Sequence, residues 1–86
     1  MEVLLHRVFK KDAKKLPTKV RQRFAVQLDV FQTDPYDPTL NNHALTGPLA
    51  RYRSINVTGD VRAWYEVSGD MVVFVRIGTH SQLYGK

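Results

Sequence analysis

Apolar residues recur at helical spacing in the first half of the chain. Pro17 suits the first turn of a helix, which we expect to run to about Gln32. Just before it, residues 10–15 predict a short basic helix. Four apolar residues of the longer helix, spaced by four, four and three positions, share one of its faces: Val20, Phe24, Leu28 and Phe31.

Runs of β-branched and aromatic residues predict four strands around these helices. They cover residues 3–9, 52–57, 61–67 and 71–77. The last three strands are joined by hairpin turns at 58–60 and 68–70, each with a Gly-Asp pair. Residues 33–48 contain two Asp-Pro dipeptides and one Gly-Pro dipeptide, and they predict a long loop.

This order of elements predicts an α+β fold of the type β-α-α-β-β-β. We expect the two helices to pack on one face of a twisted antiparallel sheet and to leave the other face partly open. The predicted core contacts join two sets of residues: Phe24, Leu28 and Phe31 from the helix, with Val61, Ala63, Val73 or Val75 from the strands.

Composition narrows the class of protein further. The 86 residues fit a single domain, residues 1–86, and the 43% hydrophobic content indicates a folded chain. Cysteine is absent and the three histidines are far apart in sequence, so we expect no disulfide, no metal and no cofactor. The apolar start of the chain is interrupted by His6 and Arg7, and no apolar run is long enough to span a bilayer. We therefore expect a cytoplasmic protein.

Charge is distributed unevenly along the chain. Residues 1–32 carry eight Lys and Arg against three Asp and Glu, whereas residues 33–86 carry five of each. A basic segment on a small domain suggests an acidic partner such as RNA, although a solvated helix face has the same composition. The predicted RNA-binding residues are these basic side chains and two from the second strand: Lys10, Lys11, Lys14, Lys15, Arg21, Arg23, Arg53 and Asn56.

The C-terminal stretch carries the groups best suited to chemistry. Arg76 offers a fork of donors to phosphate, His80 can exchange a proton near neutral pH, and Tyr84 has a ring that can stack on a base. We expect Gly78 to release the chain from the sheet, so that His80 lies on a short tail. By alternation, Arg76 is expected on the same strand face as Phe74. The alternative is a solvated tail with no special role.

Three further candidates lie outside this stretch. His43 is in the long loop, and Asp60 is in a hairpin turn, where Gly-Asp is also an ordinary turn pair. On the second strand, Ser54 and Asn56 share a face that we expect to be exposed.

Taken together, these residues form a recognisable succession. Asn-His-Ala-Leu-Thr-Gly at 42–47 is followed by Tyr52-Arg53, Asp60 and Tyr65, and then by Arg-Ile-Gly-Thr-His-Ser-Gln-Leu-Tyr-Gly at 76–85. The succession resembles the YafQ-type branch of the RelE/ParE superfamily of bacterial type II toxins, over the whole chain. The resemblance implies an mRNA interferase that cuts messenger RNA in the ribosomal A site and is neutralised by a cognate antitoxin.

The resemblance also implies roles for individual residues. His43 matches the loop histidine of the family's active site, Asp60 its acidic residue, Arg76 its strand arginine, His80 its catalytic C-terminal histidine and Tyr84 its terminal aromatic residue. Two positions depart from the family pattern, because Asn56 replaces a histidine and Ser54 stands where an acidic residue is expected.

Two other functions remain open from the sequence. A ParE-like toxin of the same fold would poison DNA gyrase without cutting RNA. A module that binds nucleic acid or peptide without catalysis would need only the basic helices, and the departures at Ser54 and Asn56 favour it.

Overall fold

Five strands and three α-helices follow one another along residues 1–85, the part of the chain that the computed structural model describes. Two short 3₁₀ helices, Pro38–Leu40 and Gly47–Leu49, lie in the segment between α2 and β3. The bounds of the main elements are β1 Glu2–Leu5, α1 Arg7–Lys14, α2 Thr18–Thr33, β2 His43–Ala44, β3 Arg53–Asn56, β4 Val61–Ser68, β5 Met71–Thr79 and α3 His80–Tyr84.

The strands form one sheet in the order β1-β5-β4-β3-β2. β5, β4 and β3 are antiparallel neighbours, as the two hairpin turns predict, and β2 adds a further antiparallel strand next to β3 that was not predicted. β1, however, lies parallel to β5, with Glu2 opposite Met71 and Leu5 opposite Phe74. The expectation of a wholly antiparallel sheet is therefore wrong at this edge. Strand direction here depends on how the chain returns through α1 and α2, which local alternation does not encode.

The first strand is shorter than its composition predicts, because a helix begins inside the segment 3–9. His6 adopts an extended conformation and its Nδ1 accepts a hydrogen bond from Val8 N–H at 3.0 Å, which caps α1. From there, Phe9, Ala13 and Leu16 follow at helical spacing and turn toward the core. The cap and this spacing override the β propensity of the apolar residues.

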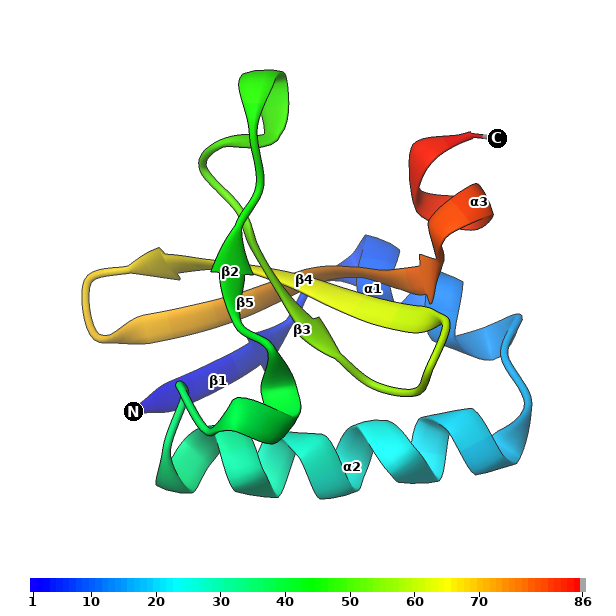
Figure 1. Ribbon diagram of the computed structural model, residues 1–86, viewed down its shortest axis with the longest axis horizontal. Coiled ribbons are helices and arrows are strands. Elements are labelled where there is room, and N and C mark those ends of the chain that lie inside the picture. The colour runs from blue at the N-terminus through cyan, green and yellow to red at the C-terminus, as the bar shows by residue number, and fades with distance from the viewer. Residues whose placement is uncertain (86) are drawn as a thin grey trace.

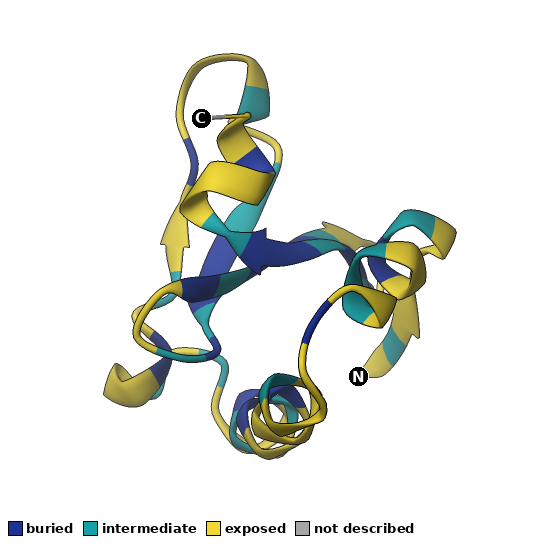
Figure 2. Cartoon of the chain, turned by 90° about the vertical axis from the view of Figure 1, so that its right-hand side faces the viewer, coloured by how far each residue is buried: buried dark blue, intermediate teal, exposed yellow. Residues whose placement is uncertain are grey.

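One face of the sheet is covered by α2, as predicted, and α1 lies along the edge of β5 with Phe9 and Ala13 turned into the same core (Figure 1). Phe24 and Phe31 of α2 are buried, while Leu28 is only partly buried. Phe9, Phe24 and Phe31 all contact the ring of Phe74, with centroid distances of 5.3–6.1 Å. Figure 2 shows the same arrangement from the side, with buried positions concentrated in the sheet and exposed positions on the outside of α2.

The other face of the sheet carries a second, smaller apolar cluster. Trp64, Val75 and Leu83 are buried there together with Leu45, and Val73 packs against them. The predicted contacts of α2 with Val73 and Val75 are therefore wrong, whereas Val61 and Ala63 do belong to the core beneath α2. In Figure 1, α3 and the tip that holds Gly47–Leu49 both rise on this side, opposite α2. We call it the open face.

The segment expected to be a long loop is mostly ordered by short local structures. Asp37 caps the first 3₁₀ helix, and hydrogen bonds from the backbone N–H and hydroxyl of Thr39 lower the pKa of its carboxyl group. Leu40 is completely buried, and Asn41 then takes a left-handed conformation with φ of 46°. This turn delivers His43 to the sheet edge, where it pairs with Ser54 of β3.

Candidate active site

A bulge in β5 places Arg76 on the open face. Trp64 of β4 pairs with Arg76, but the next residue, Tyr65, pairs with Phe74, so Val75 is an extra residue on β5. The extra residue shifts the alternation, and Arg76 lies on the side of Trp64 instead of the side of Phe74. The expectation that Arg76 shares a face with Phe74 is therefore wrong.

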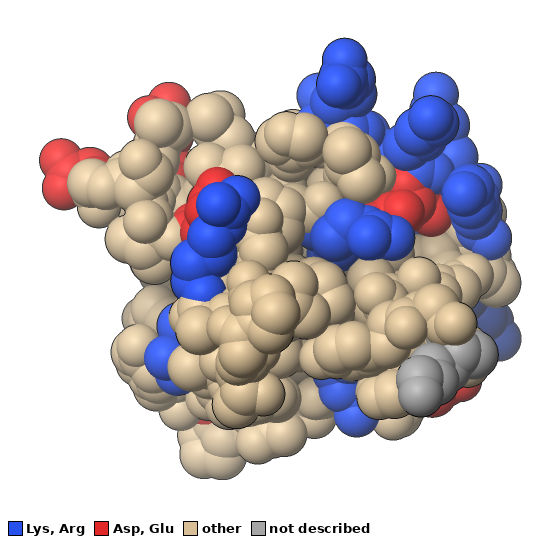
Figure 3. Space-filling view, turned by 90° about the horizontal axis from the view of Figure 1, so that it is seen from above, with Lys and Arg blue, Asp and Glu red and all other residues tan. Residues whose placement is uncertain are grey.

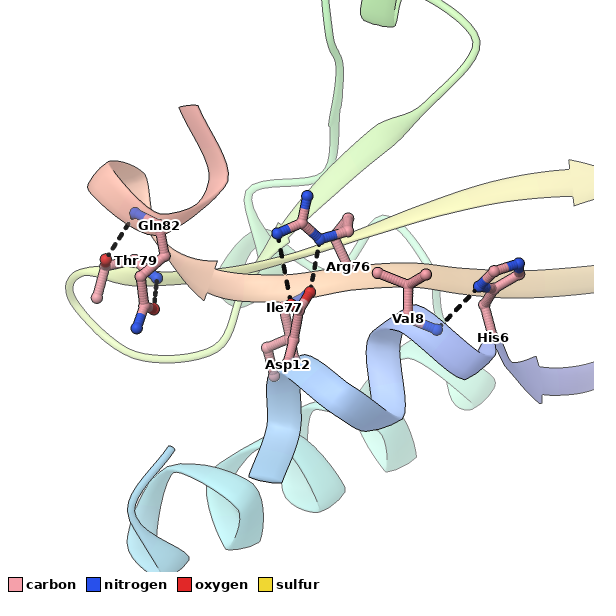
Figure 4. Close-up of polar contacts among 7 residues, drawn as sticks. All are labelled: His6, Val8, Asp12, Arg76, Ile77, Thr79 and Gln82. Atoms are coloured by element: carbon pink, nitrogen blue, oxygen red, sulfur yellow. Dashed lines mark hydrogen bonds and ion pairs between the residues drawn. The ribbon is translucent and has the colours of Figure 1, made fainter. Parts of the chain in front are cut away.

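Helix α3 begins directly at the end of β5 and presents His80 in its first turn. Thr79 and Gln82 form a capping box: the Thr79 hydroxyl accepts from Gln82 N–H at 3.2 Å, and Gln82 Oε1 accepts from Thr79 N–H at 2.8 Å (Figure 4). The sequence suggested that Gly78 releases the chain from the sheet. This prediction is wrong, because β5 continues through Thr79. Instead, Gly78 allows α3 to approach the strand closely.

Gly78→Ala is expected to displace α3. A Cβ atom at this position would lie 2.9 Å from Gln82 Oε1 and 3.1 Å from Gln82 Cβ, so the capping box would have to open. Loss of a helix cap typically costs about 1 kcal/mol. We expect a lower melting temperature and shifted NMR amide signals for residues 79–84. Gly59→Ala is the matched control, because nothing lies within 4 Å of a Cβ atom there. Unchanged α3 signals in the Gly78 variant would show that the helix tolerates the added atom.

Asp60 and His80 line the same pocket, a hollow of about 390 Å³ between α3 and the β3–β4 hairpin. Both residues are exposed, and Asp60 Oδ1 accepts a hydrogen bond from the Thr58 hydroxyl at 3.2 Å. Arg62, which our reading of the sequence missed, also lines this pocket. Its guanidinium donates to the carbonyls of Thr58 and Gly59 and so fixes the hairpin beside His80. Alternation along β4 places Arg62 with Trp64 and is the signal that would have found it.

His43 and Tyr84 line a neighbouring pocket of about 220 Å³. The His43 Nδ1 atom lies 2.8 Å from the carbonyl oxygen of Asn41. Since a carbonyl only accepts, Nδ1 carries the hydrogen in this contact, and the neutral ring then has its lone pair on Nε2. Tyr84 connects this pocket to the previous one, because its ring is 4.5 Å from the ring of His80.

Arg76 lines a third pocket on the open face, with a volume of about 310 Å³. Trp64 forms part of its lining, and the Trp64 ring is 6.4 Å from the near-parallel ring of Tyr52 and 5.2 Å from that of Tyr84. Arg76 is not free: its Nε donates to Asp12 Oδ2 of α1 at 2.6 Å. Asp12 is a second residue that our reading of the sequence missed, although an acidic residue between Phe9 and Ala13 on an apolar helix face signals a partner.

Arg53 and Asn56 lie apart from these pockets. Arg53 pairs with Tyr65 and therefore faces the side covered by the helices. There its Nε donates to Asn42 Oδ1 at 2.8 Å, and Asn42 donates to the Tyr65 hydroxyl, whose pKa is raised chiefly by burial. Asn56 lines a separate hollow with Arg23 of α2, and its Oδ1 is buried without a hydrogen-bond partner in residues 1–85.

Ser54 is not exposed as expected but is 2% accessible. It lies between His43 on β2 and Trp64 on β4, its pairing neighbours in the sheet. Strand β2 came from a segment predicted to be a loop, so the sequence did not reveal that Ser54 would be flanked on both sides. An ionised carboxylate here would be desolvated, which explains why a small hydroxyl fits.

The basic residues of the first helices are exposed, and those on α1 lie together. Figure 3 shows Lys and Arg side chains gathered over α1 at one corner of the open face, while most of the remaining surface in that view is uncharged. Arg21 differs from the others because it donates hydrogen bonds to Ala13 O and the Thr18 hydroxyl. The exposed lysines of α1 and of the position that follows it are Lys10, Lys11, Lys14 and Lys15.

Two classes of feature are not found in the described chain. Within residues 1–85, no group of three or more His, Asp or Glu side chains is placed to hold a metal ion. None of the helices over the same residues has the length and apolar character that crossing a membrane requires.

Comparison with known proteins places this arrangement in a family. Residues 1–85 match the family described as bacterial toxin of type II toxin-antitoxin system, YafQ. A copper-bound mutant toxin from Helicobacter pylori is similar in structure, with a TM-score of 0.75 and 30% identity over 96% of this chain and 98% of the other. A comparison with curated proteins found no match.

Two further solved structures have the same fold. YafQ from E. coli superposes with a TM-score of 0.76 at 23% identity, covering 98% of each chain. A chain of the RelB–RelE antitoxin–toxin complex from Methanococcus jannaschii superposes with a TM-score of 0.76 at 25% identity, covering 95% of each chain. From the family match over residues 1–85, we conclude that this chain belongs to the YafQ family of toxins from bacterial type II toxin–antitoxin systems.

Proposed function

We propose that this toxin is a metal-free endoribonuclease that cuts messenger RNA on the ribosome and thereby inhibits translation. The observation that carries the proposal is the pocket shared by His80 and Asp60 at the end of β5. Around it, His43, Tyr84 and Arg76 line adjoining pockets on the same face. A proton donor, proton acceptors and cations on one exposed face are what RNA cleavage without a metal requires.

The reaction needs one bond to form and one to break. The 2′-oxygen of the RNA attacks the adjacent phosphorus, and the bond from phosphorus to the 5′-oxygen of the next nucleotide breaks. A base takes the proton from the 2′-hydroxyl, and an acid gives a proton to the departing 5′-oxygen. The products are a 2′,3′-cyclic phosphate and a free 5′-hydroxyl.

We assign the acid to His80, because it is exposed in the pocket and an imidazole exchanges protons near neutral pH. Two residues qualify as the base. His43 directs Nδ1–H to Asn41 O, so in the neutral ring Nε2 is the nitrogen that can accept a proton, and Asp60 has a carboxylate in the same pocket as His80. Neither role requires Asn56, whose amide does not titrate and which lies in a different hollow.

Charge and orientation are supplied by two other residues. Arg76 neutralises the negative charge that develops on the phosphorane oxygens in the transition state. Tyr84 is 41% exposed, packs its ring against His80 and offers the remaining surface to a base of the message.

The lysines over α1 are proposed to bind the ribosomal RNA backbone. Replacing Lys10, Lys11, Lys14 or Lys15 singly by Gln is expected to weaken ribosome binding with little effect on folding. Removing one phosphate contact lowers the slope of log affinity against log salt by up to about 0.9. Lys19→Gln on α2 is the matched control, because it removes the same charge from another exposed position. Equal salt slopes for all five variants would identify the α1 lysines as a solvated surface only.

The proposed partners are a cognate antitoxin and the translating ribosome. Solved complexes of RelB with RelE and of DinJ with YafQ support the first, because their toxin chains share this fold. A small domain with apolar side chains exposed at its edge, such as Leu4 at 44% and Val67 at 63%, has surface for such a partner. A message-cutting toxin acts where translation takes place, so we place it in the cytoplasm.

A translation assay with the purified protein separates the proposed function from its rivals. We expect the message to be cut in the presence of ribosomes while DNA gyrase continues to supercoil plasmid. Inhibited gyrase with an intact message would instead identify a ParE-like toxin. Binding to ribosomes without cleavage or gyrase inhibition would indicate a non-catalytic module.

A further inference from the structure

We propose that Asp12 is a positioning residue that holds Arg76 by one edge of its guanidinium and leaves the opposite edge to the RNA phosphate. The proposal rests on the proposed ribonuclease function and extends it to a residue of α1. No motif of the C-terminal stretch includes Asp12, which is 64 positions away from Arg76 in sequence.

The geometry of the contact is that of a side-on clamp. Arg76 Nε donates to Asp12 Oδ2 at 2.6 Å, and Arg76 Nη2 lies 3.4 Å from Asp12 Oδ1. The backbone N–H of Ile77 donates to Oδ2 at 3.2 Å and fixes the carboxylate against β5. Both partners are therefore tied to rigid elements, Asp12 to α1 and the strand, and Arg76 to the strand.

The other edge of the guanidinium remains available. Figure 4 shows the third nitrogen of Arg76 pointing away from Asp12, on the side of β5 opposite α1. Within residues 1–85, Arg76 Nη1 makes no hydrogen bond, and Arg76 lines the pocket that contains Trp64. A planar guanidinium can bind two oxyanions at once, one on each edge, so the clamp and the phosphate do not compete for the same N–H groups.

Burial makes this clamp stronger than a surface ion pair. The side chain of Asp12 is 13% exposed and that of Arg76 is 34% exposed, so water reaches the carboxylate poorly and the arginine side chain more readily. A free arginine samples many rotamers, and a cation displaced by about 1 Å from the reacting phosphate can cost about 10²-fold in rate. Asp12 removes that freedom before the RNA arrives.

The clamp also lowers the attraction that Arg76 exerts on RNA, because the carboxylate cancels its charge at a distance. The two effects act on different kinetic constants. Positioning acts on the rate of the chemical step, whereas net charge acts on the affinity for the ribosome and its message. Removing the Asp12 charge should therefore slow cleavage without weakening binding.

The test uses Asp12→Asn in the complete protein, measured by single-turnover cleavage of a defined message on ribosomes at rising toxin concentration. The amide that this substitution introduces can still accept from Ile77 N–H but no longer holds the guanidinium by charge. We expect the maximal rate to fall about 10-fold or more, while the half-saturating concentration stays the same or decreases. In an Arg76→Ala background, Asp12→Asn should have no further effect on the rate.

Asp29→Asn is the matched control, because it removes one exposed carboxylate from α2 and changes the net charge equally. A purely structural Asp12 would give a lower melting temperature with an unchanged maximal rate at temperatures where the variant is folded, and that result would overturn the proposal. An additive loss in the Arg76→Ala background would also overturn it. If the wild-type protein does not cut the message at all, the ribonuclease function itself fails, and the role of Asp12 fails with it.

Discussion

His80→Ala is expected to abolish message cleavage, or reduce it by about 10²–10⁴-fold, while the protein stays folded. His80 is exposed at the first residue of α3, and the capping box of that helix uses Thr79 and Gln82 instead. The substitution removes the packing of the His80 ring against Tyr84, at 4.5 Å. The melting temperature should therefore fall by only a few degrees, since surface changes of this kind cost about 0.5 kcal/mol. Cleavage is measured on ribosomes, and folding by circular dichroism.

The pH dependence of the rate distinguishes an acid from a binding residue. With His80 as the acid, one limb of the wild-type pH–rate profile depends on His80, and His80→Ala loses that limb. Ser81→Ala is the matched control, since it removes a polar group from the same pocket and the same turn of α3. If His80→Ala cuts as fast as the wild type, the acid is another group, and the assignment must shift to His43 or Asp60.

Arg76→Ala is expected to lower cleavage by about 10²-fold or more, the range found for removing one preorganised charge donor from a transition state. Unlike the His80 variant, it should also destabilise the protein. Asp12 would keep only its bond from Ile77 N–H and would lie 13% exposed without a cation. We expect a loss of about 1–3 kcal/mol in the free energy of unfolding, measured by urea titration.

Two variants control the Arg76 experiment. Arg51→Ala removes an arginine whose side chain is 69% exposed and whose contact with Glu66 is 3.5 Å long, so its loss should cost less than about 1 kcal/mol. Arg76→Lys keeps the charge but loses the forked geometry, and it should fold well yet cut slowly. Wild-type rates in both Arg76 variants would show that the cation at this position is not used in cleavage.

The helical layer was predictable because its signal is local and periodic. Phe24 and Phe31 fall on one face of α2, and both are buried in the structure. The hairpins were predictable for a similar reason, because a Gly-Asp pair between two apolar runs leaves few other conformations. The boundary between β1 and α1 was predicted wrongly, because the same apolar residues fit the spacing of a strand and that of a helix. The contact that determines where the helix begins is the hydrogen bond from Val8 N–H to the His6 side chain.

The sheet's finer features depend on pairing between distant strands. Neither the parallel direction of β1 nor the extra residue Val75 in β5 has a signature in the local sequence. Both matter for the site, since the bulge moves Arg76 from the core face to the open face. A strict period of two therefore placed Arg76 beside the wrong neighbours.

The residue types of the candidate site could be predicted from the sequence, but the residues that hold them in place could not. Histidine, arginine and aspartate close to the ends of elements indicate chemistry by their nature, and the family resemblance gave them roles. Arg62 acts through local contacts with the carbonyls of its own hairpin, whereas Asp12 meets Arg76 across 64 positions, a contact that only the folded chain creates.

The chemical nature of the RNA ends tests the proposed mechanism most directly. The wild-type protein is incubated with ribosomes and a defined message, and the new ends are examined by ligation and phosphatase treatment. Attack by the 2′-hydroxyl with His80 as the acid predicts 5′-hydroxyl ends and 2′,3′-cyclic phosphates, which His80→Ala should form far more slowly or not at all. Ends that carry a 5′-phosphate and a 3′-hydroxyl, or an uncut message, would contradict it.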